Sequence, residues 1–177
     1  MKLVQRVAVS LLLFAAGCTA ARGNDEDFPV EIHGRAAALL FVGIDCPISN
    51  GYAPQLKRII SDYSGRGIDF YLVYPDATIT LDAAKNHAAD YGYSCPVLID
   101  PRRQLVKKWG VTVTPEAAVV SSRGELLYLG RIDDSYAALG RKRFAVTTNN
   151  LRDALDAIVA GRPVAVARTT AVGCSID

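Results

Sequence analysis

Short apolar runs alternate with amphipathic stretches along most of this chain. The segment from Ala36 to Ile44 is almost continuously apolar, which predicts a buried strand. Residues 51–63 follow with apolar side chains at helical spacing, which predicts a helix with one face on the core. The same patterns predict further elements, in chain order a strand at 68–74, a helix at 80–91, a strand at 96–99, a short helix at 103–109, a hairpin at 116–120 and 125–129, and a helix at 150–160. Strands that alternate with helices before a final hairpin predict an α/β fold with a mixed sheet and an antiparallel hairpin at its edge.

Composition and charge narrow the class of protein. The chain has 177 residues, of which 50% are hydrophobic and 21% are charged, enough for one domain with a hydrophobic core. The net charge of +2 is too small to indicate a nucleic-acid partner. The two histidines, His33 and His87, are distant in sequence and are expected in loops or at the surface. With no Cys-x-x-Cys pair and no glycine-rich nucleotide pattern, neither a metal site nor an organic cofactor is predicted.

The first residues predict an export signal. Lys2 and Arg6 form a basic start, and the apolar stretch at 7–16 is too short to span a bilayer. Small residues then lead directly to Cys18. This junction resembles the signal of bacterial lipoproteins, in which the cysteine is lipidated and becomes the mature N-terminus. Cleavage without lipidation is the alternative, because Ala15 stands where that signal usually has a larger aliphatic residue.

These features divide the chain into four parts. Residues 1–17 are the predicted signal peptide, 18–30 a polar tether, 31–161 a single folded domain and 162–177 a C-terminal tail. The mature protein is therefore expected outside the cytoplasm, in the periplasm or an equivalent compartment, and attached to the membrane if Cys18 carries lipid.

The junction between the first strand and the first helix carries the strongest chemical signal, Asp45-Cys46-Pro47-Ile48-Ser49-Asn50. Cys46 falls at the position that caps a helix, and Pro47 falls at the first helical position, which proline favours. The unpaired N–H groups and the positive dipole end of a helix favour the thiolate, which is the reactive form of cysteine. We therefore expect Cys46 to be a reactive thiol, with a half-buried structural cysteine as the alternative.

The order of elements, joined to this turn, resembles the thioredoxin fold. Proteins of that fold start the active-site helix at the nucleophilic cysteine, as at Cys46, and commonly bend it at a proline about eight residues on, as at Pro54. They also place a cis-proline, preceded by a small or β-branched residue, before the hairpin, as at Thr114-Pro115. The resemblance covers residues 32–160 and is strongest to the redoxin family, which includes thiol-specific antioxidant proteins and exported thioredoxin-like lipoproteins.

The resemblance implies a thioredoxin-like three-layer sandwich and a redox function. Cys46 would attack a disulfide of a protein or small-molecule client, while Thr114 and Pro115 would shape the groove for that client. Electrons would arrive through a partner thiol, so no cofactor is implied. Ser49 stands where dithiol thioredoxins carry the second cysteine, so it can polarise the sulfur of Cys46 but cannot close a disulfide.

Two alternative functions remain open from the sequence. Peroxiredoxins, which are relatives, carry a threonine three residues before the peroxidatic cysteine. This chain has Gly43 there, which argues against efficient peroxide reduction. Arg131 could supply the arginine of a peroxidatic site, or could pair at the surface with the aspartates that follow it. The other alternative is a non-catalytic thioredoxin-fold module that binds a partner or Cu(I) through Cys46 and Cys174.

A second thiol to resolve a disulfide at Cys46 must come from elsewhere in the chain. Cys95 precedes the third strand, at the opposite edge of a parallel sheet from Cys46. That separation exceeds the roughly 7 Å between Cα atoms that a disulfide tolerates, so Cys95 is expected as a small buried hydrophobe. Cys174 lies in a tail long enough to cross a small domain, and it either resolves Cys46 or stays an unpaired tail thiol.

Overall fold

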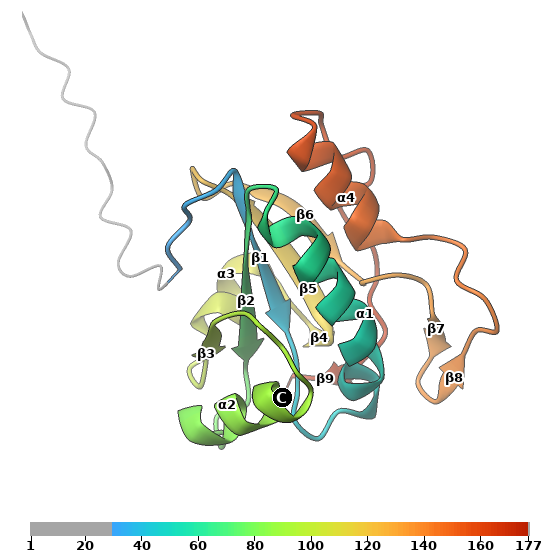
Figure 1. Cartoon of the computed structure of the whole chain (residues 1–177). Coiled ribbons are helices and arrows are strands. Elements are labelled where there is room, and N and C mark those ends of the chain that lie inside the picture. Colours follow the sequence, from blue (N-terminus) through green and yellow to red (C-terminus); the bar gives the residue numbers. More distant parts are fainter. Residues whose placement is uncertain (1–29, 177) are drawn as a thin grey trace, which may run out of the picture.

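The computed structural model describes residues 30–176 (Figure 1). The predicted signal peptide, Cys18 and nearly all of the predicted tether lie outside the described residues. Within the described part, none of the helices is both long enough and apolar enough to cross a membrane.

Five strands form the central sheet, in the spatial order β3 (Val97–Ile99), β2 (Ile68–Tyr74), β1 (Ala36–Phe41), β5 (Glu116–Ser121) and β6 (Leu126–Gly130). Strands β3, β2 and β1 run parallel to one another, β5 is antiparallel to β1, and β6 is antiparallel to β5. All six residues of the central strand β1 are buried, as expected for a strand covered on both faces. The predicted mixed sheet with an antiparallel hairpin edge is confirmed.

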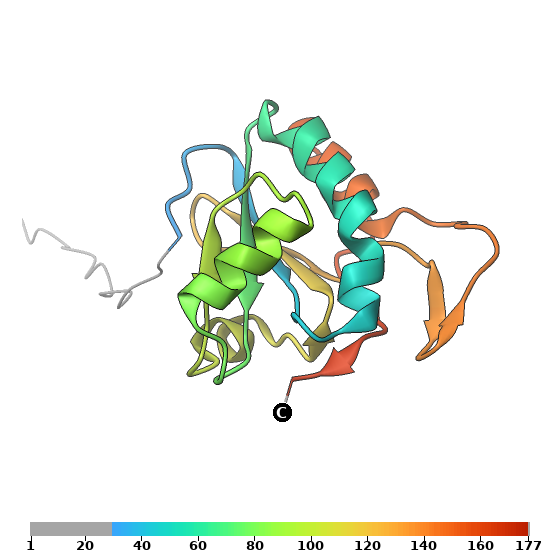
Figure 2. The same cartoon turned by 60° about the horizontal axis from the view of Figure 1, so that its bottom comes forward.

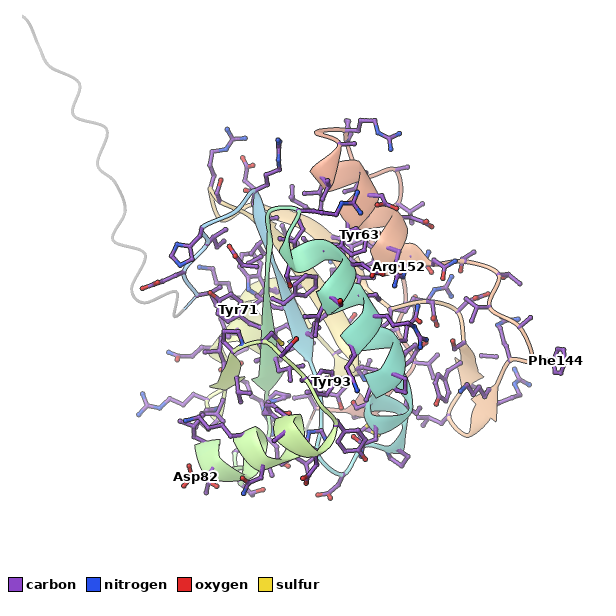
Figure 3. All side chains as sticks on the ribbon, viewed as in Figure 1. Tyr63, Tyr71, Asp82, Tyr93, Phe144 and Arg152 are labelled. Carbon is purple, nitrogen blue, oxygen red and sulfur yellow. The ribbon has the colours of Figure 1, made fainter. Side chains whose placement is uncertain are left out.

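Four helices cover the two faces of this sheet, α1 (Pro47–Ser64), α2 (Leu81–Asp90), α3 (Gln104–Trp109) and α4 (Asn150–Val159). Buried side chains of α1, α2 and α4 form one apolar cluster with alternate residues of β1, and α3 packs in a second cluster on the opposite face. Arg152 of α4 lies beside Tyr63 of α1, 5.8 Å from its ring centre (Figure 3). The arrangement is a three-layer α/β sandwich, as predicted.

The first helix begins at Pro47, as the position of that proline predicts, so the cysteine motif belongs to the helix itself. One detail of the second helix differs from the sequence-based prediction. In α2 the apolar spacing predicts that Leu81 faces the core, but Leu81 is 39% exposed. The buried residues of α2 are Ala84, His87 and Ala88, and His87 is only 8% exposed although the sequence predicts it in a loop or at the surface.

Between β6 and α4 the chain forms an arm that projects from the domain. Its short hairpin consists of β7 (Tyr136–Ala138) and β8 (Arg141–Lys142), and all residues from 139 to 149 are exposed. Phe144 lies far out on this arm (Figure 3). The buried Asp134 holds the base of the arm, because its carboxylate accepts hydrogen bonds from the backbone N–H groups of residues 147 and 148.

The C-terminal tail returns across the domain to the cysteine motif. It first runs along β6, where the backbone of Leu129 bonds to Ala167 at 2.9 Å and to Thr169 at 3.0 Å. It ends in β9 (Cys174–Ser175), which pairs with β4 (Val113–Thr114) in antiparallel register. Figure 2 shows this last strand beside the first turn of α1.

Candidate functional site

Cys46 caps the N-terminus of α1. Its backbone is extended, with φ −88° and ψ 108°, and Pro47 directly follows as the first helical residue. The sulfur accepts a hydrogen bond from the backbone N–H of Ser49 at 3.4 Å, which occupies one of the unpaired donors at the helix end. The Cys46 side chain is buried, with only 4% of the residue exposed, so the capping geometry holds the thiol inside a pocket.

The segment before the hairpin supplies the opposite wall of the site. The Thr114-Pro115 peptide bond is cis, and the carbonyl oxygen of Thr114 lies 3.1 Å from the Cys46 sulfur, which donates a hydrogen bond to it as a thiol. The buried carboxylate of Glu116 accepts hydrogen bonds from the backbone N–H groups of Thr112 at 2.8 Å and Val113 at 3.4 Å. The carboxylate therefore fixes the backbone that leads into Thr114. Sequence reasoning missed Glu116, whose role depends on this loop conformation.

The last strand, β9, brings Cys174 next to Cys46. The register of β4 and β9 pairs Thr114 with Cys174, so one threonine contacts both cysteines through its backbone. A glycine precedes the second thiol for a steric reason, because a Cβ atom on Gly173 would overlap the carbonyl group of Thr114. Of the cysteines in the described chain, the structure thus brings together Cys46 and Cys174.

The two thiols have opposite pKa shifts. Burial alone raises the pKa of Cys46, but hydrogen bonds from Cys174 and Ser49 outweigh it and lower that pKa to about 7. Burial raises the pKa of Cys174 to about 11, and the neighbouring Cys46 adds to that rise. At pH 7 roughly half of the Cys46 side chains are therefore thiolate, and that thiolate accepts a hydrogen bond from the Cys174 thiol.

Ser49 and Gly43 shape the space around the sulfur. The hydroxyl oxygen of Ser49 accepts a hydrogen bond from the backbone N–H of Gly43 at 3.2 Å, and the Ser49 side chain helps to lower the pKa of Cys46. A Cβ atom on Gly43 would lie 3.0 Å from Oγ1 of Thr114 and 3.2 Å from Cβ of Cys46. A threonine like that of peroxiredoxins would therefore crowd both residues.

A pocket of about 440 Å³ opens beside the two thiols. Its walls are the loop 43–46, the loop 75–79, Arg103 of the turn before α3, Thr114, and residues 174–176 of the tail. Asp45, which directly precedes the thiol in the sequence, is exposed and lines this pocket. A pocket of this size can hold a small molecule or a short peptide segment.

Two other predicted residues lie away from the site. Cys95 lines a separate pocket with Asp69 and Tyr71, and burial raises the pKa of its thiol to about 12. It is half-buried and packs against the core. Arg131 is not among the residues that line the pocket. Its guanidinium group donates to Oδ1 of Asn150 at 2.7 Å, at the start of α4, instead of pairing with the aspartates that follow it.

The described residues contain no group of three His, Cys, Asp or Glu side chains that could hold a metal ion. The site offers the two sulfurs of Cys46 and Cys174, and His87 bonds to Tyr74 and Asn50 rather than facing them. Two cysteines alone are a small ligand set for a soft ion such as Cu(I). What the arrangement offers directly is sulfur chemistry between a thiolate and an adjacent thiol.

Comparisons with known proteins identify relatives of this chain. Thiol-disulfide oxidoreductase ResA of Halalkalibacterium halodurans is 23% identical over 100 residues, which cover 55% of this chain and 54% of the relative. This chain therefore spans about half the length of the ResA proteins that it matches.

Two solved structures resemble more of the chain. An uncharacterized conserved protein from Geobacillus kaustophilus is 27% identical, with a TM-score of 0.72 over 81% of this chain and 77% of the other. A hypothetical protein from Sinorhizobium meliloti is 28% identical, with a TM-score of 0.71 over 81% and 79%. The family model named Redoxin matches residues 30–157. The chain belongs to the redoxin family.

Proposed function

We propose that this protein is a thiol–disulfide oxidoreductase in which Cys46 is the attacking thiolate and Cys174 is the resolving thiol. The observation that carries the proposal is the contact between a thiol of lowered pKa at a helix N-terminus and a second thiol on the C-terminal strand. The ResA relatives are named as thiol-disulfide oxidoreductases, which supports the same reaction class.

Reduction of a client disulfide would take two exchange steps. The Cys46 thiolate attacks one client sulfur, a bond forms between the two, and the other client sulfur leaves as a thiolate. That leaving thiolate takes the proton of Cys174, whose sulfur then attacks the sulfur of Cys46. A Cys46–Cys174 disulfide forms and the second client sulfur leaves. The client gains two electrons, and a dithiol of a partner protein later returns two electrons to this pair.

The residues around the sulfurs have separate roles in this scheme. Ser49 stabilises the thiolate by hydrogen bonding, while Thr114 and Pro115 form the wall against which the client disulfide lies. Because Cys174 is already beside Cys46, the second step requires no large movement of the tail once the client is attached. The client is a protein or small molecule that carries a disulfide accessible to the pocket beside Cys46.

The exchange reaction is tested with purified protein, a small aromatic disulfide and an excess of a dithiol reductant. Cys46→Ser should abolish turnover. Cys174→Ser, treated with the disulfide after removal of the reductant, should retain the first step and accumulate a mixed disulfide at Cys46, which intact-mass measurement detects. Cys95→Ser is the matched control and should behave as the parent protein. Full turnover by Cys46→Ser would reject the assignment of the nucleophile, and a loss through Cys95→Ser would reject the assignment of the pair.

We also propose that the protein is exported and held at a membrane by lipid on Cys18. The support is the N-terminal sequence, in which a basic start and a short apolar stretch lead to small residues and a cysteine. Labelling of growing cells with an alkyne fatty acid tests this proposal. The parent chain should be labelled and found with membranes, whereas Cys18→Ser should be unlabelled. Equal labelling of both would refute lipidation at this position.

A further inference from the structure

His87 lies between two loops that form the thiol pocket. It is buried on α2, and its two ring nitrogens have different partners. Nδ1 lies 2.9 Å from the hydroxyl oxygen of Tyr74, and Nε2 lies 3.0 Å from Oδ1 of Asn50. The exchange mechanism proposed above does not involve this histidine. Both of its ring nitrogens are nevertheless hydrogen-bonded inside the protein.

The contact between Asn50 and Ile44 determines the direction of both hydrogen bonds of His87. The side-chain nitrogen Nδ2 of Asn50 donates to the carbonyl oxygen of Ile44 at 2.8 Å, which leaves Oδ1 as the acceptor toward His87. Nε2 of His87 therefore carries the proton, and Nδ1 accepts from the hydroxyl of Tyr74. This is the neutral imidazole, and burial, the largest influence, lowers the pKa of His87 despite the opposing charges of Asp90 and Asp45.

Each end of this chain of hydrogen bonds lies at a pocket wall. Tyr74 is the last residue of β2 and directly precedes the wall formed by residues 75–79. Ile44 belongs to the wall formed by residues 43–46. Asn50 also donates its backbone N–H to the carbonyl of Cys46 at 3.0 Å, so its two bonds to the loop bracket Asp45 and Cys46.

We propose that His87 is a positioning residue that fixes both pocket loops and thereby keeps the Cys46 sulfur in place. The inference extends the proposed function, since the thiol that it positions is the one assigned as nucleophile. His87 touches neither sulfur directly. It orients the Asn50 amide, the amide holds the loop before Cys46, and the sulfur keeps its contacts with Ser49 and Thr114. The His87 ring also accepts a hydrogen bond from Tyr74, which links the wall formed by residues 75–79 to the wall formed by residues 43–46.

A matched pair of substitutions separates this role from simple packing. In His87→Gln the amide nitrogen can reach the place of Nε2 and donate to Asn50. In His87→Asn the shorter amide can replace only Nδ1, so the link to Asn50 is lost. Asn50→Ala removes this link together with the bond from Asn50 to Ile44, and it tests the Asn50 step of the network if His87→Asn fails to fold. Phe144→Ala on the exposed arm is the control.

The readout is the pH profile of alkylation of Cys46 by iodoacetamide, followed by peptide mass, together with the melting temperature. For His87→Asn and Asn50→Ala we expect the midpoint of the profile to rise by about one pH unit, as hydrogen bonds to the thiolate weaken. His87→Gln and Phe144→Ala should keep the parent midpoint.

Lower melting temperatures with an unchanged midpoint in all variants would overturn the proposal and leave His87 as packing only. Equal midpoint shifts in His87→Gln and His87→Asn would also overturn it, because the Asn50 link would then be irrelevant. Alkylation needs no disulfide client. The exchange assay could therefore fail while His87→Gln and His87→Asn still differ in the midpoint of alkylation. That result would reject the proposed function and retain the positioning role of His87.

Discussion

A single methyl group on Gly173 should uncouple the two thiols. In Gly173→Ala the added Cβ atom would overlap the carbonyl of Thr114, so β9 must move away from β4. Cys174 moves with it and no longer donates hydrogen bonds to Cys46. Those hydrogen bonds are major causes of the lowered pKa of Cys46. Once the tail no longer covers the thiol, the hydrogen bonds from Ser49 are the remaining cause that lowers this pKa.

The expected size of the effect follows from the thiolate population. At pH 7 a thiol with a pKa of about 7 is roughly half thiolate, and complete loss of the shift to 9.0 leaves about one per cent, about a fiftyfold decrease. A more basic thiolate is intrinsically more nucleophilic, by roughly six- to tenfold over this range. The alkylation rate of Cys46 at pH 7 should therefore fall by at most about five- to eightfold, and its pH midpoint should move upward by up to about two pH units.

Alkylation across pH and formation of the Cys46–Cys174 disulfide under mild oxidation measure the two consequences separately. Gly65→Ala is the matched control, because Gly65 has φ −76° and an added Cβ atom there would meet no atom within 4 Å. The control should react as the parent. If Gly173→Ala keeps the parent midpoint and forms the disulfide at the parent rate, then contact with Cys174 does not set the reactivity of Cys46.

Other expected outcomes concern peroxide, pH and the environment of Gly43. Hydrogen peroxide should oxidise Cys46 slowly compared with a small disulfide, since Gly43 offers no hydroxyl; rapid sulfenic acid formation would contradict this. Gly43→Thr should lower disulfide turnover at least several-fold without faster peroxide consumption, because its side chain crowds Thr114 and Cys46. The contribution of Cys46 to the free energy of unfolding under reducing conditions should increase from pH 7 to 9 by at most about 2 kcal/mol, because the lowered pKa of Cys46 stabilises the folded thiolate form. This gain is lost as pH falls through 7, and denaturant titrations of Cys46→Ser should show it missing.

Much of the fold follows from local patterns in the sequence. The apolar run of β1, the turn signals and the helical spacing of α1 and α4 are local, and the elements appear within a few residues of their predicted ends. The position of Cys46 is also local, since a capping residue followed by Pro47 defines a helix start without tertiary contacts. The resemblance to redoxins then supplied the order in which the strands meet.

The rest of the site depends on contacts between distant segments. The tail has no apolar periodicity that would predict β9, and its two-residue pairing with β4 is visible only in three dimensions. The requirement for glycine at position 173 follows from that pairing, because a Cβ atom there would overlap the carbonyl group of Thr114. His87 can be buried because Tyr74 of β2 and Asn50 of α1 provide hydrogen-bond partners for its ring. These partners are distant in the sequence, so the sequence alone predicts a surface position for this polar residue. Leu81 is exposed because it begins α2 at the edge of the packed face.

Mapping the disulfide of the oxidised protein tests the central proposal most directly. The reduced protein, without Cys18 lipid, is treated with one equivalent of a small disulfide, quenched with acid and digested without reduction. Peptide mass spectrometry should find Cys46 linked to Cys174 within one chain and Cys95 as a thiol. A link from Cys46 to Cys95, or a thiol at Cys174 beside a lasting mixed disulfide on Cys46, would contradict the assignment of Cys174 as the resolving thiol.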